Sequence, residues 1–190
     1  MSTSAYGRKK QPEQVRRALL DAAVALAEEQ GLAGVTVQAV ADRAGVTKGG
    51  LFHHFPNKQA LVEAAFDDII ERMDSTIDRL IARDGETEGC FTRAYVITTL
   101  DDCGPDSSVS ANALSISMIT DPALRVRWGN WMAGRLRRHQ ATDDRPHLAV
   151  VRLAADGYWF AHILQVQDES QADIDALRAR LIAMSSGPER

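Results

Sequence analysis

The sequence predicts an all-α protein, and two observations lead to this prediction. Apolar residues recur every three or four positions along most of the chain, which is the spacing of a buried helix face, and no segment shows the two-residue alternation of a convincing strand. The composition agrees, because only six prolines occur in 190 residues while Ala, Leu and Arg are abundant. A chain of this length can form one domain or two small ones with a real core.

The first predicted helix begins at Pro12, where the missing backbone N–H costs nothing, and stops at Gly31. Residues 1–11 are expected to form a flexible basic arm. A short helix follows, for which Thr36 is a typical N-cap residue. Its apolar face comprises Val37, Val40, Ala41 and Ala44.

A second short helix follows the turn at Gly45. Leu51 and Phe55, four residues apart, can anchor it from below, but its other residues build no core. These other residues are Thr47, Lys48, Gly50, Phe52, His53 and His54. Two short helices joined by a glycine turn, with hydrogen-bond donors on the second, are typical of a helix-turn-helix whose second helix enters the DNA major groove.

The rest of the chain is predicted to be helical as well. Asn57 caps a long helix that ends near residues 83–85, and further helices are expected over about 89–100, 107–119, 121–140, 147–166 and 172–184. The predicted helix 147–166 is apolar around most of its circumference, so it must be buried on more than one side. We therefore divide the chain into an N-terminal three-helix DNA-binding domain, 1–57, and a C-terminal helical domain, 58–190.

The net charge of −4 is unevenly distributed. Residues 1–58 hold 8 Lys and Arg against 5 Asp and Glu, whereas the remainder holds 14 against 21. A basic N-terminal part joined to an acidic remainder suits a chain that presents only its N-terminal part to DNA phosphates. Chance clustering also explains so small an excess of positive charge.

Several classes of protein find no support in the sequence. No apolar run is long enough to span a membrane and no secretory signal opens the chain, so a cytoplasmic location is expected. Cys90 and Cys103 fit no metal-ligand spacing and are expected to stay reduced, so neither a metal nor a cofactor is predicted. The chain is not expected to be an enzyme, because it contains no nucleophile signature, P-loop or dinucleotide glycine motif.

The run from Ala22 to Leu61 resembles the DNA-binding domain of the TetR family of bacterial transcription regulators. Two positions depart from the family pattern: Phe52 replaces a Tyr whose hydroxyl would bond a phosphate, and Gly50 fills a position that often carries a side chain. The matching residues, in order, are Ala22-Ala23, Gly31-Leu32, Thr36-Val37, Val40-Ala41, Ala44-Gly45-Val46-Thr47, Gly49, Leu51-Phe52-His53-His54-Phe55 and Lys58-Gln59-Ala60-Leu61.

The resemblance implies DNA contacts from the two short helices and the start of the next one. Thr47 would cap the recognition helix and bond a phosphate, while Lys48 and His53 would reach base edges or phosphates. A solvated turn with incidental histidines is the alternative. The full expected set is Thr36, Gln38, Thr47, Lys48, Gly49, Gly50, Phe52, His53, His54 and Lys58.

The resemblance further implies a homodimeric repressor that a small molecule releases from a palindromic operator. The last two long helices would join the two copies, with a candidate seam of Gly157, Ile174, Leu177 and Leu181. The effector would occupy a cavity in the C-terminal domain, although for any single lining residue an ordinary core is the favoured interpretation. The candidate lining is Tyr95, Met118, Trp128, Trp131, Asp156, Trp159, Phe160 and His162.

Some alternatives remain open at this point. Arg152, four residues before Asp156, is expected to pair with it, which would leave Asp156 without a role in binding. A helix-turn-helix regulator could also be controlled by protein partners, or by oxidation of Cys90 or Cys103. Cys103 lies in a Gly-Pro loop and is expected to be accessible, although the acidic residues around it disfavour the thiolate.

Overall fold

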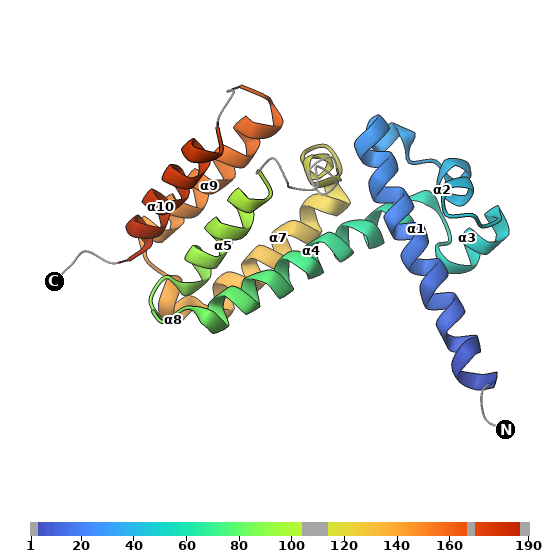
Figure 1. The fold of residues 1–190 in the computed structure, drawn as a ribbon, viewed down its shortest axis with the longest axis horizontal. Coiled ribbons are helices and arrows are strands. Elements are labelled where there is room, and N and C mark those ends of the chain that lie inside the picture. The colour runs from blue at the N-terminus through green and yellow to red at the C-terminus, as the bar shows by residue number, and fades with distance from the viewer. Residues whose placement is uncertain (1–3, 104–113, 167–169, 187–190) are drawn as a thin grey trace. The chain divides into compact units, whose positions relative to one another are not determined.

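The computed structural model describes residues 4–103, 114–166 and 170–186, and of residues 4–11 it describes the backbone alone. All regular structure in these ranges is helical, which confirms the predicted fold class (Figure 1). The elements are α1 (Ser4–Gly34), α2 (Val37–Arg43), α3 (Lys48–His54), α4 (Lys58–Arg83), α5 (Cys90–Asp101), a 3-10 turn (Ser117–Ile119), α7 (Pro122–Arg138), α8 (Gln140–Asp143), α9 (Pro146–Ile163) and α10 (Gln171–Ser185). None of these helices combines the length and apolar character that a bilayer crossing requires.

The chain divides into two compact units. The first comprises Met1–Ile69 and Val109–Arg127, and the second comprises Ile70–Ser108 and Trp128–Arg190, so that both α4 and α7 belong partly to each. The boundary predicted between residues 57 and 58 falls within the first unit, and it stays a prediction about function.

The core of the first unit joins the helix-turn-helix to its neighbours. Leu19 of α1, Val40 of α2, Leu51 of α3 and Leu61 of α4 are all fully buried. The guanidinium of Arg17 also donates to the carboxylate of Asp68 at 2.6 Å. The two seven-residue helices are too short to be stable alone, so this shared core must hold them in place.

The first helix differs from its prediction at its start. The backbone of α1 is helical from Ser4, so the helix begins before the start predicted at Pro12, and residues 1–3 lie outside the described part. Pro12 lies inside the helix, where its ring removes one backbone hydrogen bond and crowds the carbonyl of the preceding turn. The predicted stop at Gly31 is confirmed as a break, since this residue has φ of +67° and ψ of −179°.

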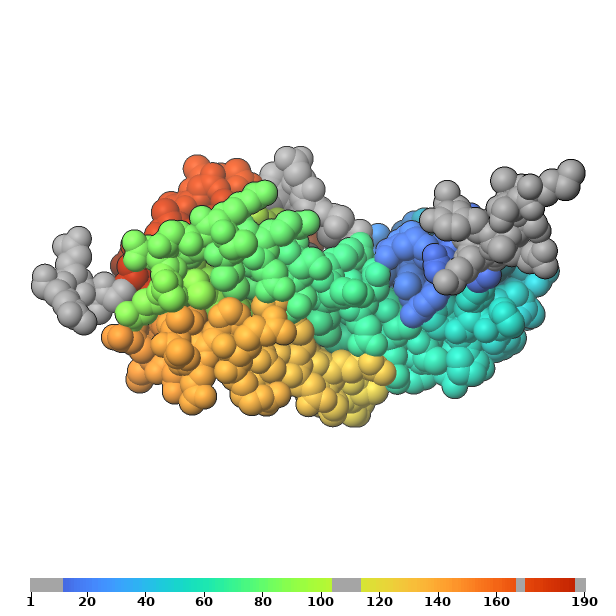
Figure 2. Space-filling view, turned by 90° about the horizontal axis from the view of Figure 1, so that it is seen from below, coloured from blue at the N-terminus to red at the C-terminus, as the bar shows by residue number. Residues whose placement is uncertain are grey.

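The second unit is built around α5. Ten of its twelve residues are buried, because α5 contributes to two apolar clusters at once. One cluster joins α5 to α9 and α10 through Val96, Leu100, Val151, Ala155, Ile174 and Leu181. The other joins α5 to the parts of α4 and α7 in this unit, which lie side by side in Figure 2, through Ile77, Phe91, Ala94 and Tyr95 with Trp128 and Trp131 packed against them.

The connections differ more from prediction than the helices do. Residues 104–113, which hold most of a predicted loop and the start of a predicted helix, lie outside the described residues. The short helix α8 was not predicted. Cys103 is buried, 2% exposed, and its thiol donates to the Thr99 carbonyl at 3.4 Å, so the prediction that it is accessible is wrong.

Candidate nucleic-acid interface and effector region

The helix-turn-helix is held by local hydrogen bonds that the sequence predicts. The Thr36 hydroxyl oxygen accepts from the Ala39 amide at 3.1 Å, and the Thr47 hydroxyl oxygen accepts from the Gly50 amide at 3.1 Å. Each bond satisfies an amide that the first turn of a helix leaves without a partner. Gly45, at φ +68°, makes the turn between them in a backbone region that side chains disfavour.

The helix α3 has one anchored face and one open face. Leu51 is fully buried and Phe55, directly after the helix, is 3% exposed, while the Arg16 guanidinium lies 4.9 Å from the Phe55 ring centre. The open face presents Lys48, Gly49, Phe52 and His53 to solvent, with Gly50 and His54 half-buried. Phe52 is 47% exposed, which is unusual for so large an apolar side chain. The helix therefore offers a donor-rich surface that its own protomer does not cover.

The two histidines differ in their surroundings. Their rings meet edge to face with centroids 5.6 Å apart, and His53 is exposed whereas His54 is half-buried. Burial, aided by the neighbouring His53 ring and the positive charge of Arg16, lowers the pKa of His54. This favours the neutral ring, which would approach a phosphate as an N–H donor.

Two of the predicted contact residues also hold the protein together. The Lys58 ammonium donates to the Leu32 carbonyl at 3.1 Å, which satisfies a carbonyl near the end of α1. The Gln38 amide donates to the Asp42 carboxylate at 2.6 Å along α2. Both residues are exposed, and the Lys58 ammonium keeps two further donors. The Lys58 bond could not be predicted from the sequence, because it depends on which turns meet in space, whereas the Gln38 bond is a local contact between residues four positions apart.

Comparison with known proteins identifies the family. Residues 19–65 match the family described as "Bacterial regulatory proteins, tetR family", and residues 89–186, just over half of the chain, match "Tetracyclin repressor-like, C-terminal domain". The chain belongs to the TetR family. TetR-family repressors bind operator DNA as homodimers and respond to small-molecule effectors, so this chain is a DNA-binding transcription regulator and not an enzyme.

Similar regulators align along most of this TetR-family chain. The regulator BetI 1 of Chromohalobacter salexigens is 30% identical over 178 residues, which cover 88% of this chain and 86% of that protein. The repressor KstR of Rhodococcus jostii is 28% identical over 171 residues, which cover 78% and 71%. The multidrug binding protein EbrR in complex with malachite green has the same fold, with a TM-score of 0.71 at 20% identity over 90% of this chain and 97% of that one.

The structure brings together four of the eight residues predicted to line an effector cavity. The rings of Trp128 and Trp131 lie 4.9 Å apart, Tyr95 lies 6.5 Å from Trp131, and the Tyr95 hydroxyl donates to the Asp156 carboxylate. Of the other four, Phe160 and His162 are exposed, Trp159 is half-buried, and Met118 belongs to the first compact unit.

The expected ion pair between Arg152 and Asp156 is wrong. The Arg152 guanidinium donates instead to the Thr92 hydroxyl at 2.6 Å and lies 4.0 Å from the Asp143 carboxylate. Asp156 has the Tyr95 hydroxyl as its partner, and burial raises the pKa of Asp156. Burial, together with the charge of Asp156, raises the pKa of Tyr95 well above its usual range. Asp156 is thus a carboxyl group beside aromatic rings, and Tyr95 is its one hydrogen-bonding side chain among the described residues.

The predicted dimer seam needs a correction. Ile174 and Leu181 are 3% and 4% exposed within one protomer, and Leu177 packs on the same cluster, so this stripe faces the protomer's own core. Gly157 is exposed, and a Cβ built there would have no neighbour within 4 Å. Among the large apolar residues that are exposed in one protomer, four lie on α9 or directly after it: Val150, Leu153, Phe160 and Leu164, which are 57%, 68%, 40% and 53% exposed.

Proposed function

We propose that this regulator represses transcription by inserting α3 of each protomer into the major groove of a palindromic operator, and that an aromatic effector releases it. The observation that supports the proposal most is the pair of faces on α3. Leu51 and Phe55 fix one face, while Lys48, Phe52 and His53 are exposed on the other. Unused donors on a rigidly anchored short helix suit base and phosphate contacts.

The roles of the DNA-contacting residues follow from their positions. Lys48 and His53 are proposed to read base edges or phosphates, and Thr47 and His54 to bond phosphates. Lys58 is proposed to place the remaining donors of its ammonium near the backbone of the DNA. Gly49 and Gly50 carry no side chain on the open face, which would let the α3 backbone approach the duplex closely. A regulator that works on operator DNA is proposed to be cytoplasmic.

The dimer is proposed to form through the uncovered faces of α9 and α10. Val150, Leu153, Gly157, Phe160 and Leu164 recur at intervals of three and four along α9, which is the spacing of a helix–helix seam. The outer face of α10 carries small residues that permit close approach: Ala172, Ala176, Ala179 and Ala183, all exposed. Burying these faces against a partner protomer would cover the second side of α9. This helix needs such cover, because it is apolar around most of its circumference.

The effector is proposed to bind near Tyr95, Trp128, Trp131 and Asp156. Three aromatic rings with one carboxyl group suit a flat, largely apolar molecule that carries a hydrogen-bond donor or a positive charge. Solved structures of the multidrug binding protein EbrR contain ethidium and malachite green, which are molecules of this kind. Control through oxidation of Cys103 is not favoured, because that thiol is buried.

The test begins with selection of an operator from random DNA by the full-length protein. Lys48→Ala and His53→Ala should then weaken operator binding by about 1–3 kcal/mol each, while the helical circular dichroism and the dimer stay intact. Arg137→Ala is a matched control, since Arg137 is exposed on α7 in the second unit. Unchanged operator affinity in both α3 variants would contradict the proposal.

A further inference from the structure

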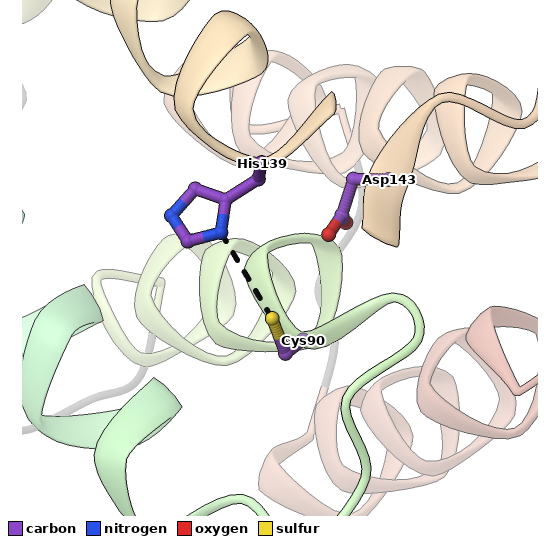
Figure 3. Close-up of side chains that lie close together, drawn as sticks. All are labelled: Cys90, His139 and Asp143. Carbon is purple, nitrogen blue, oxygen red and sulfur yellow. Dashed lines mark hydrogen bonds between the residues drawn. The ribbon is translucent and has the colours of Figure 1, made fainter. Parts of the chain in front are cut away.

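Three ligand-type side chains meet in the second unit, away from the aromatic group described above. Cys90 is the first residue of α5, and His139 and Asp143 lie four residues apart at the start and end of α8 (Figure 3). One ligand atom from each residue lies within 4.8 Å of the other two. The Cys90 sulfur lies 4.0 Å from Nδ1 of His139, so a thiol, an imidazole and a carboxylate face a common point.

The imidazole of His139 lacks the partners that a buried polar ring requires. It stacks on Phe91 with centroids 5.3 Å apart and an interplanar angle of 12°, which fixes its orientation. Its Nε2 atom is buried without a hydrogen-bond partner, and its Nδ1 faces only the sulfur, at the outer limit of a weak contact. The stacked ring therefore holds Nδ1 toward the sulfur in a fixed orientation, which suits it to bind a metal ion.

The carboxylate of Asp143 is fixed in the way that metal-ligating carboxylates are fixed. It is almost fully buried and accepts from the Thr92 amide at 2.8 Å and from the Thr92 and Thr142 hydroxyls at 2.6 and 2.8 Å. The contact from the Phe91 amide to Oδ2 is long, 3.4 Å, so this oxygen has a lone pair that is only weakly used. Hydrogen bonds of this kind orient a ligand and adjust its basicity.

The spacing of the sulfur and the nitrogen requires only a small adjustment to hold an ion. Zinc bonds of about 2.3 Å to sulfur and about 2.0–2.1 Å to nitrogen place those two ligand atoms roughly 3.6 Å apart in a tetrahedral site. The observed 4.0 Å between Sγ and Nδ1 is close to this value, and a small rotation of the Cys90 side chain would close the difference. A thiolate and a carboxylate together would balance the two charges of the ion.

We infer that Cys90, His139 and Asp143 form a binding site for a borderline-soft divalent metal ion, with Zn²⁺ the best fit. The thiolate and imidazole select zinc over the hard ions Mg²⁺ and Ca²⁺. Three protein ligands leave a fourth position for water. Bound zinc would join the start of α5 to α8. The sequence did not predict this site, because Cys90 is 49 residues away from His139 and no short motif links them.

Cobalt is a suitable probe, because thiolate ligation to Co²⁺ gives an intense near-ultraviolet absorption band that imidazole and carboxylate ligands alone do not give. The purified full-length protein, freed of metal and kept reduced without thiol reagents, should develop this band at one equivalent of Co²⁺ and lose it when Zn²⁺ is added. Cys90→Ser should abolish the band. His139→Ala should weaken Co²⁺ binding by at least about 100-fold, more than the 10–100-fold typical for residues that only support a ligand.

Cys103→Ser is the matched control, since it removes the other buried thiol of the chain and should leave the band unchanged. Thermal unfolding gives a second measurement: Zn²⁺ should raise the Tm of the wild type and of Cys103→Ser, but not that of Cys90→Ser. A wild type that gives no thiolate band, or a band that survives in Cys90→Ser, would overturn the inference. His139 would then be a packing residue of the α5–α8 contact.

Discussion

A side chain at position 50 would meet no steric barrier and would stabilise the short helix α3, yet this residue is a glycine. A Cβ at this position would meet the Thr47 hydroxyl at 3.4 Å and the Val46 Cβ at 3.8 Å, which are ordinary contacts. Gly50→Ala should therefore stabilise the free protein by up to about 1 kcal/mol, measured by thermal unfolding. It should also lower operator affinity, measured by fluorescence anisotropy, because the methyl group would stand between the backbone and the DNA.

Gly129→Ala provides the control for this substitution. Gly129 is an exposed glycine of α7 with open space around its Cβ position, so the change should add stability without affecting DNA binding. If Gly50→Ala binds the operator as tightly as the wild type does, the backbone of α3 does not approach the duplex at this residue.

The side chain of Asp102 should make stability depend on pH. Burial, reinforced by the charge of Asp101, raises its pKa from 3.8 to about 6. The folded state therefore holds a proton that the unfolded state has released, so this group's contribution to stability falls as the pH rises from about 4 to about 6. Asp102→Asn should remove this slope and raise the free energy of unfolding at pH 7 by up to about 3 kcal/mol.

Urea unfolding at pH 4, 5, 6 and 7 measures this effect. The two proteins should differ most at pH 7 and converge near pH 4, where Asp102 is protonated in both states. Asp144→Asn is the control, because Asp144 is exposed and its neutralisation should leave the slope of the wild type in place. A difference between Asp102→Asn and wild type that is constant with pH would contradict the assignment.

At the scale of elements, Arg135 joins α7 to α4. Its side chain is 2% exposed and donates to the carboxylates of Asp74 and Asp78 at 2.5 Å and to the Asp74 carbonyl at 2.9 Å. The Trp131 indole donates to the same Asp74 carboxylate at 2.6 Å. Arg135→Gln would leave Asp74 partly buried without its counter-charge and should cost about 3 kcal/mol of stability by chemical denaturation. Arg137→Gln, on the exposed face of the same helix, should change stability by less than about 0.5 kcal/mol.

The length and position of the main helices were predictable, and their partners were not. Caps at Thr36, Thr47 and Asn57 mark helix starts because the signal lies within three residues of the chain; the Asn57 carboxamide, for example, accepts from the Ala60 amide at 2.8 Å. Which apolar stripe faces which neighbour depends on tertiary packing. Ile174 and Leu181 form as regular a stripe as Val150 and Leu153 do, yet the first pair is buried in the protomer and the second is open.

The residues of the candidate sites were likewise predictable only where the signal lies within a short stretch of sequence. The open face of α3 followed from a local motif, so its exposed residues could be identified from the sequence. The partner of Asp156 could not be identified in this way, because Tyr95 is 61 residues away in the sequence whereas Arg152 is only four. The meeting of Cys90 with His139 and Asp143 likewise depends on α5 and α8 being packed together, which no spacing in the sequence indicates.

At the scale of the whole molecule, substitutions of two leucines distinguish the formation of the dimer from the stability of the protomer. Leu153 is 68% exposed in one protomer, so Leu153→Asp should leave the fold intact and split the dimer, by placing an unpaired charge in the proposed seam. Leu177 packs on the core cluster that includes Ile174, so Leu177→Asp should lower the stability of the protomer itself. Light scattering at micromolar concentration and thermal unfolding measure the two effects separately.

The opposite result is that Leu177→Asp gives a stable monomer and Leu153→Asp an unchanged dimer. It would show that the dimer interface lies at the stripe of Ile174 and Leu181. Exposed Arg137 on α7 offers a control, since Arg137 lies outside the proposed seam and Arg137→Asp should change neither measurement by much.

The burial of α5 on every side has a consequence for how the protein moves. Its backbone amides can meet solvent only after the clusters on both of its flanks have separated, so no local opening of one neighbour exposes them. Hydrogen–deuterium exchange along α5 should therefore report the free energy of opening the entire second unit. The short α2 and α3, held by two caps and a few buried side chains, should exchange orders of magnitude sooner, so that the surface proposed to read DNA is also the part of the molecule that opens most readily.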